Sequence, residues 1–331
     1  MKMEKGEFKK WMRALVCVSM TLLILPYFIG SAKAVDYPKG PVTLMVPFTP
    51  GGATDTTARA VARAMEKHLK VPVVCETKEG GGGSVGWMYL SRQKPDGYTI
   101  GMATVSIILQ QYTGAAGVNV FEFEPISEVA FLDNALSVPA NSPYKRLKEL
   151  IDFAKTNPGK IRVGNSGTGS IWHLCAVGLE EAAGVKFTHV PFKGGKPAAV
   201  AMIGGHLEAG STALGEVTEF VKGNRARILG LPSEERYYLF PDVPTFKESG
   251  YNVVMGCFVG LIAPKGTPKE IIKILDSAAK KGVESEEYKT ILGDVGNRVR
   301  YSNSEDFAKL IKFEDNLYHG YIKKLGLEMK K

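Results

Sequence analysis

Short apolar strands that alternate with amphipathic helices are the feature that most constrains this chain. Residues 42–48 (VTLMVPF) are uncharged and rich in β-forming residues, and Pro50-Gly51-Gly52 ends the segment. Apolar residues then recur at helical spacing, with Thr54 or Asp55 as the expected N-cap. The alternation continues with a strand over 72–76, a helix over 84–93 and a strand over 98–104. This order predicts parallel α/β units.

A second series of the same kind starts after about residue 137. Its loop over 164–170 is rich in Gly and Ser, and the helix that follows is expected to end at Gly184. The expected elements are helix 147–156, strand 161–164, helix 171–184, strand 187–190, helix 198–203, strands 207–212 and 226–231, an apolar stretch over 253–263, and helices 268–280 and 306–325. Two series in 331 residues predict two α/β halves.

The first 34 residues have the pattern of an export signal. Basic residues are concentrated in residues 1–13, residues 14–30 carry no charge, and Ala32-Lys33-Ala34 fits a cleavage site. We therefore predict a signal peptide that is cleaved after Ala34. The alternative is a single membrane anchor, but the uncharged stretch is at the short limit for a span and contains Pro26.

The charge and the cysteines exclude several classes of function. The leader carries half of the formal charge of +8, so the rest of the chain is nearly balanced. Nucleic-acid binding is disfavoured, because it requires a basic stripe. Cys75, Cys175 and Cys257 lack metal-ligand spacing, and an odd number cannot all pair. We expect buried thiols, no metal site and no cofactor.

Two loops share one construction, in which a strand is followed by a Gly-rich turn and the start of a helix. One loop runs over 50–55 and the other over 164–170. Glycines let backbone N–H groups point toward one position, and the start of a helix adds partial positive charge. Further donors are the hydroxyls of Thr54, Ser166, Thr168 and Ser170. Each loop is a predicted anion site, and one carboxylate held by both would bring the halves together.

Two other motifs point to different chemistry. The segment 81–86 (GGGSVG) fits the G-x-G-x-x-G dinucleotide pattern, but it follows the second strand and has no suitable acidic residue about 20 positions later. Ser170 and His173 have the residue types of a nucleophile and a base, but no G-x-S-x-G elbow surrounds Ser170. We expect His173 to cap its helix or to pack.

Several segments, taken in order, carry a family resemblance. They are YPKGPVTLMVPFTPGGATD (37–55), EGGGGSVG (79–86), KPDGYTIGMAT (94–104), NPGKIRVGNSGTGSIWHL (157–174), HVPFKGGKPA (189–198), PDVPTFKESG (241–250) and FVGLIAPKGTP (258–268). Together they resemble the substrate-binding proteins of tripartite tricarboxylate transporters, the Bug (TctC-like) family of periplasmic solute receptors. The match covers nearly the whole chain after the leader.

The resemblance implies a two-lobed periplasmic binding protein of the type II-like α/β class. In that fold each lobe is a mostly parallel sheet flanked by helices, and the ligand lies in the cleft between the lobes. Carried to this chain, it implies lobe 1 from residues 35–137 and 256–331 and lobe 2 from residues 138–255, after the signal peptide over 1–34.

The resemblance also implies a site in which the two loops hold a ligand carboxylate through backbone amides and ordered water. The implied ligand-binding residues are Pro50, Gly51, Gly52, Ala53, Thr54 and Asp55 in the first loop, Ser166, Gly167, Thr168, Ser170 and His173 in the second, and Gly194 in the turn over 193–195. We hypothesise that Asp55 caps its helix and shapes its loop, because a carboxylate repels an anion. The expected distal contacts are Phe48, Ser106, Asn134 and Thr212. Residues 211–214 (STAL) depart from the commoner family pattern, in which an aromatic residue or an Asp-Asn pair often stands.

The predicted function is a periplasmic receptor and not an enzyme. It would capture a small carboxylate-bearing ligand (a di- or tricarboxylate, an amino acid or an aromatic acid) and deliver it to the membrane permease subunits of a tripartite tricarboxylate-type transporter. A monomer without nucleic-acid partners is expected. Two alternatives stay open: an exported sensor for a signalling partner, and an exported hydrolase that uses Ser170 and His173.

Overall fold

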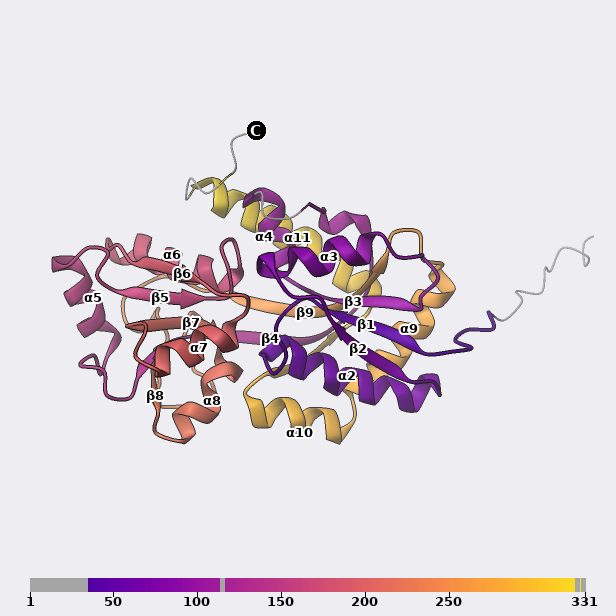
Figure 1. The fold of residues 1–331 in the computed structure, drawn as a ribbon, viewed down its shortest axis with the longest axis horizontal. Helices are drawn as coiled ribbons and strands as arrows, with labels where there is room; N and C mark the ends of the chain where they lie inside the picture. Colours follow the sequence, from indigo (N-terminus) through magenta and orange to yellow (C-terminus); the bar gives the residue numbers. More distant parts are fainter. Residues whose placement is uncertain (1–34, 114–116, 325–327, 329–331) are drawn as a thin grey trace, which may run out of the picture. The chain divides into compact units, whose positions relative to one another are not determined.

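Strands from two α/β series join in one mixed sheet (Figure 1). The computed structural model describes residues 35–113, 117–324 and 328, so the predicted signal peptide lies outside the described residues. The strand order is β2-β1-β3-β9-β4-β7-β5-β6, and β8 and β10 also pair with β4. Among the described helices, none combines the length and the apolar character needed to span a bilayer.

The first half of the sheet is formed by strands from both ends of the chain. Its strands are β1 (Val42–Val46), β2 (Val73–Thr77), β3 (Thr99–Thr104), β9 (Gly256–Pro264), β10 (Arg298–Ser302) and the first part of β4 (Phe123–Pro139). Its helices are α2 (Ala53–Leu69), α3 (Ser84–Ser91), α4 (Ser106–Thr113), α9 (Lys269–Val283), α10 (Glu286–Val295) and α11 (Ser304–Lys324). β1 pairs in parallel with β2 and β3, as the alternation predicts.

The second half is formed by the middle of the chain. Its strands are β5 (Arg162–Asn165), β6 (Thr188–Pro191), β7 (Ala209–Ala213), β8 (Ala226–Gly230) and the last part of β4. Its helices are α5 (Leu147–Thr156), α6 (Ile171–Ala183), α7 (Gly195–Ile203) and α8 (Leu214–Lys222). β5 pairs in parallel with β6 and β7.

The long strand β4 belongs to both halves. Residues 123–133 pair with β9, whereas residues 134–139 pair with β7 and β8. All of these pairs are antiparallel, which makes the sheet mixed. The alternation of strands and helices does not predict β4. Its 17 residues form one strand that no helix interrupts. Figure 1 shows β4 and β9 running between the two groups of elements.

Local sequence signals fix several element ends. α5 has the predicted bounds, and α6 ends where Gly184 adopts a left-handed conformation (φ 64°) that terminates helices. The start of α2 differs from the prediction, because its N-cap is Gly52 and not Thr54 or Asp55. The sequence patterns also do not predict α4, α8, α10 or β10.

A buried tryptophan supports the wall of the first half next to the first Gly-rich loop. Trp87 is fully buried on α3, and its Nε1 donates a hydrogen bond to the Met102 carbonyl at 3.0 Å. The ring of Phe48 packs edge-on against it, with centroids 6.1 Å apart. Burial of one such side chain contributes about 1.5–3 kcal/mol. The packing fixes Phe48 directly before the loop over 50–55.

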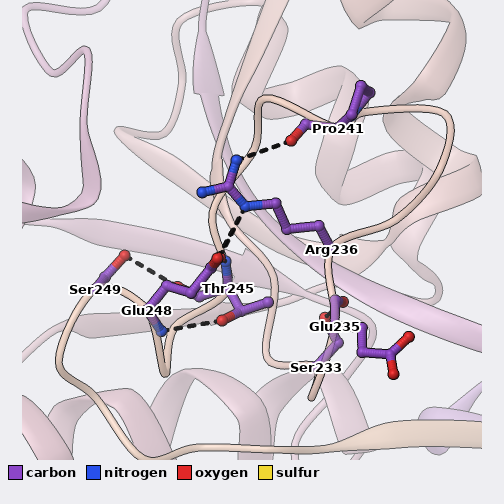
Figure 2. A network of polar contacts seen from close by, with 7 residues as sticks. All are labelled: Ser233, Glu235, Arg236, Pro241, Thr245, Glu248 and Ser249. Atoms are coloured by element: carbon purple, nitrogen blue, oxygen red, sulfur yellow. Dashed lines mark hydrogen bonds and ion pairs between the residues drawn. The ribbon is translucent and has the colours of Figure 1, made fainter.

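A polar network orders the segment that connects β8 to β9 (Figure 2). Arg236 donates from Nε to both carboxylate oxygens of Glu248 at 3.0 Å and from Nη1 to the Pro241 carbonyl at 2.9 Å. Glu248 also accepts the Thr245 N–H at 2.7 Å, while Thr245 Oγ1 accepts the Glu248 N–H at 3.0 Å. This reciprocal pair has the pattern of a capping box. The network therefore fixes the course of the segment from β8 to β9, which is one of the connections between the halves.

Candidate ligand-binding site

A small buried cavity lies where the two Gly-rich loops approach each other. Its volume is about 20 Å³, which is room for about one water molecule. Its lining comes from both halves: Phe48, Gly52, Ala53, Thr54, Thr104, Ser106, Leu132, Ser166, Ile171, Trp172, Gly195, Glu216 and Cys257. The structure thus brings the two predicted anion loops to one place.

The first loop presents the start of α2 to this cavity. Gly52 is the N-cap in an extended conformation (φ −80°, ψ 171°), and it has no side chain to accept the first N–H groups of the helix. The Ala53 N–H instead donates to Glu216 Oε1 at 3.4 Å. A carboxylate from the second half therefore lies at this helix start, where the partial positive charge stabilises an anion.

Asp55 shapes the first loop from the side away from the cavity. Its carboxylate is buried and accepts the Gly51 N–H at 2.8 Å and the Arg59 Nε–H at 2.9 Å. The contact with Gly51 agrees with the loop-shaping part of the hypothesis. The capping part is wrong, because the helix already begins at Ala53 and Asp55 lies within its first turn.

The second loop is held by its own side chains. Asn165 Oδ1 accepts the Gly167 N–H at 3.0 Å, and Ser170 Oγ accepts the His173 N–H at 3.3 Å. Ser170 is therefore the N-cap of α6. Gly167 has a φ of +117°, and a Cβ on it would lie 3.2 Å from the Cα of Gly82 in the first half. Only glycine suits this backbone conformation and this close approach.

A hydroxyl group joins two helix starts across the cavity. Ser106, the first residue of α4, is buried, and its Oγ accepts the N–H of Ile171, the first residue of α6, at 3.3 Å. The two helices belong to different halves. Ser106 therefore links the two halves as well as lining the cavity.

Glu216 is the charged residue in the cavity lining. It lies on α8, is 6% exposed, and accepts the Ala213 N–H through Oε2 at 3.0 Å in addition to the bond from Ala53. Gly195, the first residue of α7, lies so close that a Cβ there would be 2.6 Å from Glu216 Cδ. The carboxylate thus lies beside the starts of α2, α7 and α8.

Burial dominates the electrostatics of Glu216. Loss of water raises the pKa of its carboxyl from 4.5 to about 7. Hydrogen bonds from the Ala213 and Ala53 N–H groups and the charge of Lys196 lower the pKa by a smaller amount. Near neutral pH the side chain is therefore divided between its neutral and ionised forms.

His173 is neutral over most of the physiological pH range. Burial, followed by the nearby His189, lowers the pKa of its ring from 6.5 to about 4, and Glu180 acts in the opposite direction. Its Nδ1 accepts the Gly169 N–H at 3.3 Å, so the ring packs under the second loop as expected. Within the described residues, no group of three His, Cys, Asp or Glu side chains is placed to hold a metal ion.

The predicted site residues divide into three sets. Gly52, Ala53, Thr54, Ser106 and Ser166 line the cavity, as does Phe48. Pro50, Gly51 and Asp55 border a separate surface hollow. The remaining predicted residues, which the lining does not include, are Gly167, Thr168, Ser170, His173, Gly194 and Thr212.

Two expected distal contacts bind each other instead. Asn134 and Thr212 are buried, and Asn134 Nδ2 donates to the Thr212 carbonyl at 3.0 Å and to Ser211 Oγ at 3.2 Å. Ser211 Oγ in turn donates to the Trp172 carbonyl at 2.7 Å. These bonds fix β7 against β4 and α6, behind the cavity wall.

Sequence patterns do not point to Glu216 or to most of the apolar wall. The missed lining residues are Thr104, Leu132, Ile171, Trp172, Glu216 and Cys257. One signal for Glu216 exists, because a Glu three residues after an N-cap position often bonds back to the N-cap N–H. Ala213 and Glu216 have this spacing, but it becomes informative only when α8 is known.

Comparisons with known proteins agree on one family. The family model described as "Tripartite tricarboxylate transporter family receptor" matches residues 57–327. The "UPF0065 protein in gbd 5'region" of Cupriavidus necator is 32% identical over 321 residues, which are 95% of this chain and 96% of that protein. The structure of the periplasmic binding protein BugD has a TM-score of 0.85 at 31% identity, and the match covers 89% of this chain and all of that chain. R. palustris Rpa4515 with adipate has a TM-score of 0.84 at 26% identity, with 88% and 99% covered.

Proposed function

This chain belongs to the tripartite tricarboxylate transporter receptor family, and we propose that it captures a small carboxylate-bearing ligand for a membrane permease of that transporter type. Membership of a family of periplasmic binding proteins implies export. We further propose that a signal peptide is cleaved after Ala34 and that the mature protein is a monomer in the periplasm. The R. palustris relative was solved with adipate, which supports a dicarboxylate ligand over a tricarboxylate, an amino acid or an aromatic acid.

One observation carries the proposal: backbone donors in the cavity between the loops bond to a carboxyl group. The Glu216 carboxylate accepts the N–H groups of Ala53 and Ala213. A ligand carboxylate offers the same two oxygen acceptors in the same geometry, so the same donors suit it. Hydrogen bonds to a charged group contribute about 1.5–3 kcal/mol each, and a few of them suffice for micromolar affinity at about −8 kcal/mol.

Binding would be coupled to closure of two lobes. We assign lobe 1 to residues 35–137 and 256–331 and lobe 2 to residues 138–255. Contacts from a ligand to both loops favour the closed form, and the segments that join the lobes accommodate the rotation. The pairing partners of β4 change between Asp133 and Asn134, a few residues before the proposed boundary at 137. The permease would then recognise the closed form.

The hydrolase alternative is weakened by the contacts of its two residues. Ser170 Oγ caps α6, and His173 Nδ1 accepts the Gly169 N–H. A nucleophile and its base need a direct hydrogen bond between their side chains. The contacts here are instead made with backbone N–H groups, which suits two residues that shape a binding loop.

Two measurements test the proposed function. Mass spectrometry of the small molecules released by denaturing the purified protein is expected to find a carboxylic acid. Calorimetric titration of protein refolded without ligand is then expected to give micromolar binding of that acid, within a panel of adipate, other di- and tricarboxylates, amino acids and aromatic acids. Absence of binding by the whole panel, together with ester turnover that Ser170→Ala abolishes, would refute the receptor assignment. Two membrane-protein genes beside this one would favour transport over signalling.

A further inference from the structure

Glu216 occupies the position that the proposed function assigns to a ligand carboxylate. Its side chain is 6% exposed and lines the cavity together with Gly52 and Ala53 of the first loop. The acceptor atoms at this position therefore belong to the chain itself.

The helix starts around Glu216 are built for an external acceptor. The N-caps of α2 and α7 are Gly52 and Gly194, which have no side chains to cap their helices. Gly195 leaves room for the carboxylate where any larger residue would overlap it. Glu216 satisfies the Ala53 N–H and, on its own helix, the Ala213 N–H.

The same side chain joins the two halves. Glu216 and Ala213 belong to the second half, whereas Ala53 belongs to the first. With this bridge in place the cavity has only about 20 Å³, far too little for adipate. A dicarboxylate can therefore enter the site only if the halves separate, and the Glu216 bridge opposes that separation.

We propose that Glu216 is an internal surrogate ligand, whose carboxyl group bridges the halves of the ligand-free protein and is displaced by an incoming carboxylate. The identity of the competitor rests on the proposed function, but the bridge is a property of the chain alone. Displacement makes Glu216 a determinant of affinity, because every ligand has to compete with it. It also gives the ligand-free receptor a stabilised closed form.

Small-angle scattering of refolded, ligand-free protein at pH 6 tests the bridge. Glu216→Ala is expected to increase the radius of gyration, since the Ala53 N–H loses its partner and the halves separate. The matched control is Glu219→Ala on the same helix, whose side chain is 67% exposed and pairs with Lys222. The control is expected to scatter like the wild type. Equal scattering by Glu216→Ala and the wild type would overturn the proposal.

Chemical rescue separates an empty anion site from a misfolded variant. Millimolar propionate, which resembles the end of the Glu side chain, is expected to restore the compact form of Glu216→Ala and to leave the wild type unchanged. Circular dichroism checks that the variant is folded. Glu216→Gln, which keeps the shape and one acceptor, serves if the alanine variant does not fold, and an intermediate radius is expected. Failure of propionate to compact a folded Glu216→Ala protein counts against the bridge.

Titration with adipate tests displacement separately. Glu216→Ala is expected to bind adipate at least tenfold more tightly than the wild type, with Glu219→Ala unchanged. Weaker binding by Glu216→Ala would make Glu216 a ligand contact and would overturn the competitor role. If neither protein binds adipate or any acid of the panel, the proposed function fails, and scattering with propionate rescue still decides the bridge.

Discussion

Gly195 and Glu216 fit together only because Gly195 has no side chain. A Cβ on Gly195 would lie 2.6 Å from Glu216 Cδ and 2.8 Å from Oε1, closer than non-bonded atoms approach. The start of α7 therefore depends on a residue of the following helix, although the two residues share no hydrogen bond. The position of the Glu216 carboxylate can therefore be changed by mutating either Gly195 or Glu216.

Gly195→Ala is expected to lower the free energy of unfolding by about 1–3 kcal/mol, the usual cost of overpacking. The cost should largely vanish in a Glu216→Ala background, because the colliding carboxylate is then absent. Urea unfolding of the two single variants and the double variant gives the coupling energy. Gly320→Ala is the control, since nothing lies within 4 Å of its added Cβ. Additive costs would mean that Gly195 and Glu216 do not interact.

The pH dependence of stability is expected to carry the signature of Glu216. Its pKa is about 7 in the folded protein and 4.5 as a free side chain, so its contribution to stability is full below pH 4.5 and is lost as the pH rises to 7. The loss is on the order of 3 kcal/mol. Lys196 and Cys257 are the charged or titratable groups coupled to this carboxyl. Urea unfolding of the wild type and Glu216→Gln from pH 4.5 to 8 should show the difference, and parallel curves would contradict it.

Ser170→Ala is expected to lower the free energy of unfolding by about 0.5–2 kcal/mol, as for other N-caps. Ser285→Ala is a matched control outside the cavity lining, because Ser285 caps α10 through the Tyr288 N–H at the same distance of 3.3 Å. Denaturant unfolding should give similar losses for both variants. An ester-hydrolysis assay should show the same background rate for the wild type and both variants, whereas a rate lost only in Ser170→Ala would favour the hydrolase.

His173 is expected to titrate with a pKa of about 4 in NMR spectra of its ring protons, assigned with His173→Gln. Because this pKa lies below the free value of 6.5, the contribution of His173 to stability is present above pH 6.5 and is lost as the pH falls to 4. The contribution of His173 to stability therefore changes with pH in the direction opposite to that of Glu216. A midpoint near 6.5 would show that the ring is not buried under the second loop.

Local sequence signals predicted the elements that depend on local physics. The bounds of α5, the end of α6 at Gly184 and the parallel strands of each half follow from periodicity and glycine conformation. The two Gly-rich loops were also predicted as neighbours of one site, and residues of both line the cavity. The family resemblance was confirmed by the family match.

Features that depend on long-range contacts were not predictable from local patterns. Thr54 and Asp55 are good N-cap residues, yet α2 starts at Ala53, whose N–H bonds to Glu216, far along the sequence. Asn134 and Thr212 have the polarity of ligand contacts, yet they bond to each other. In each case the residue that makes the decisive contact belongs to another element, and local sequence patterns do not predict where that element lies in the fold.

The strand β9 has a consequence for the order in which the protein forms. It lies between β3 and β4 and pairs with both, although β3 ends at Thr104 and β9 begins only at Gly256. During synthesis the first half therefore lacks its central strand until residues 256–264 have emerged. Such non-local pairing slows folding. A chain that cannot complete the fold of its first half early stays unfolded for longer. The unfolded chain is the form that can pass through a narrow export channel.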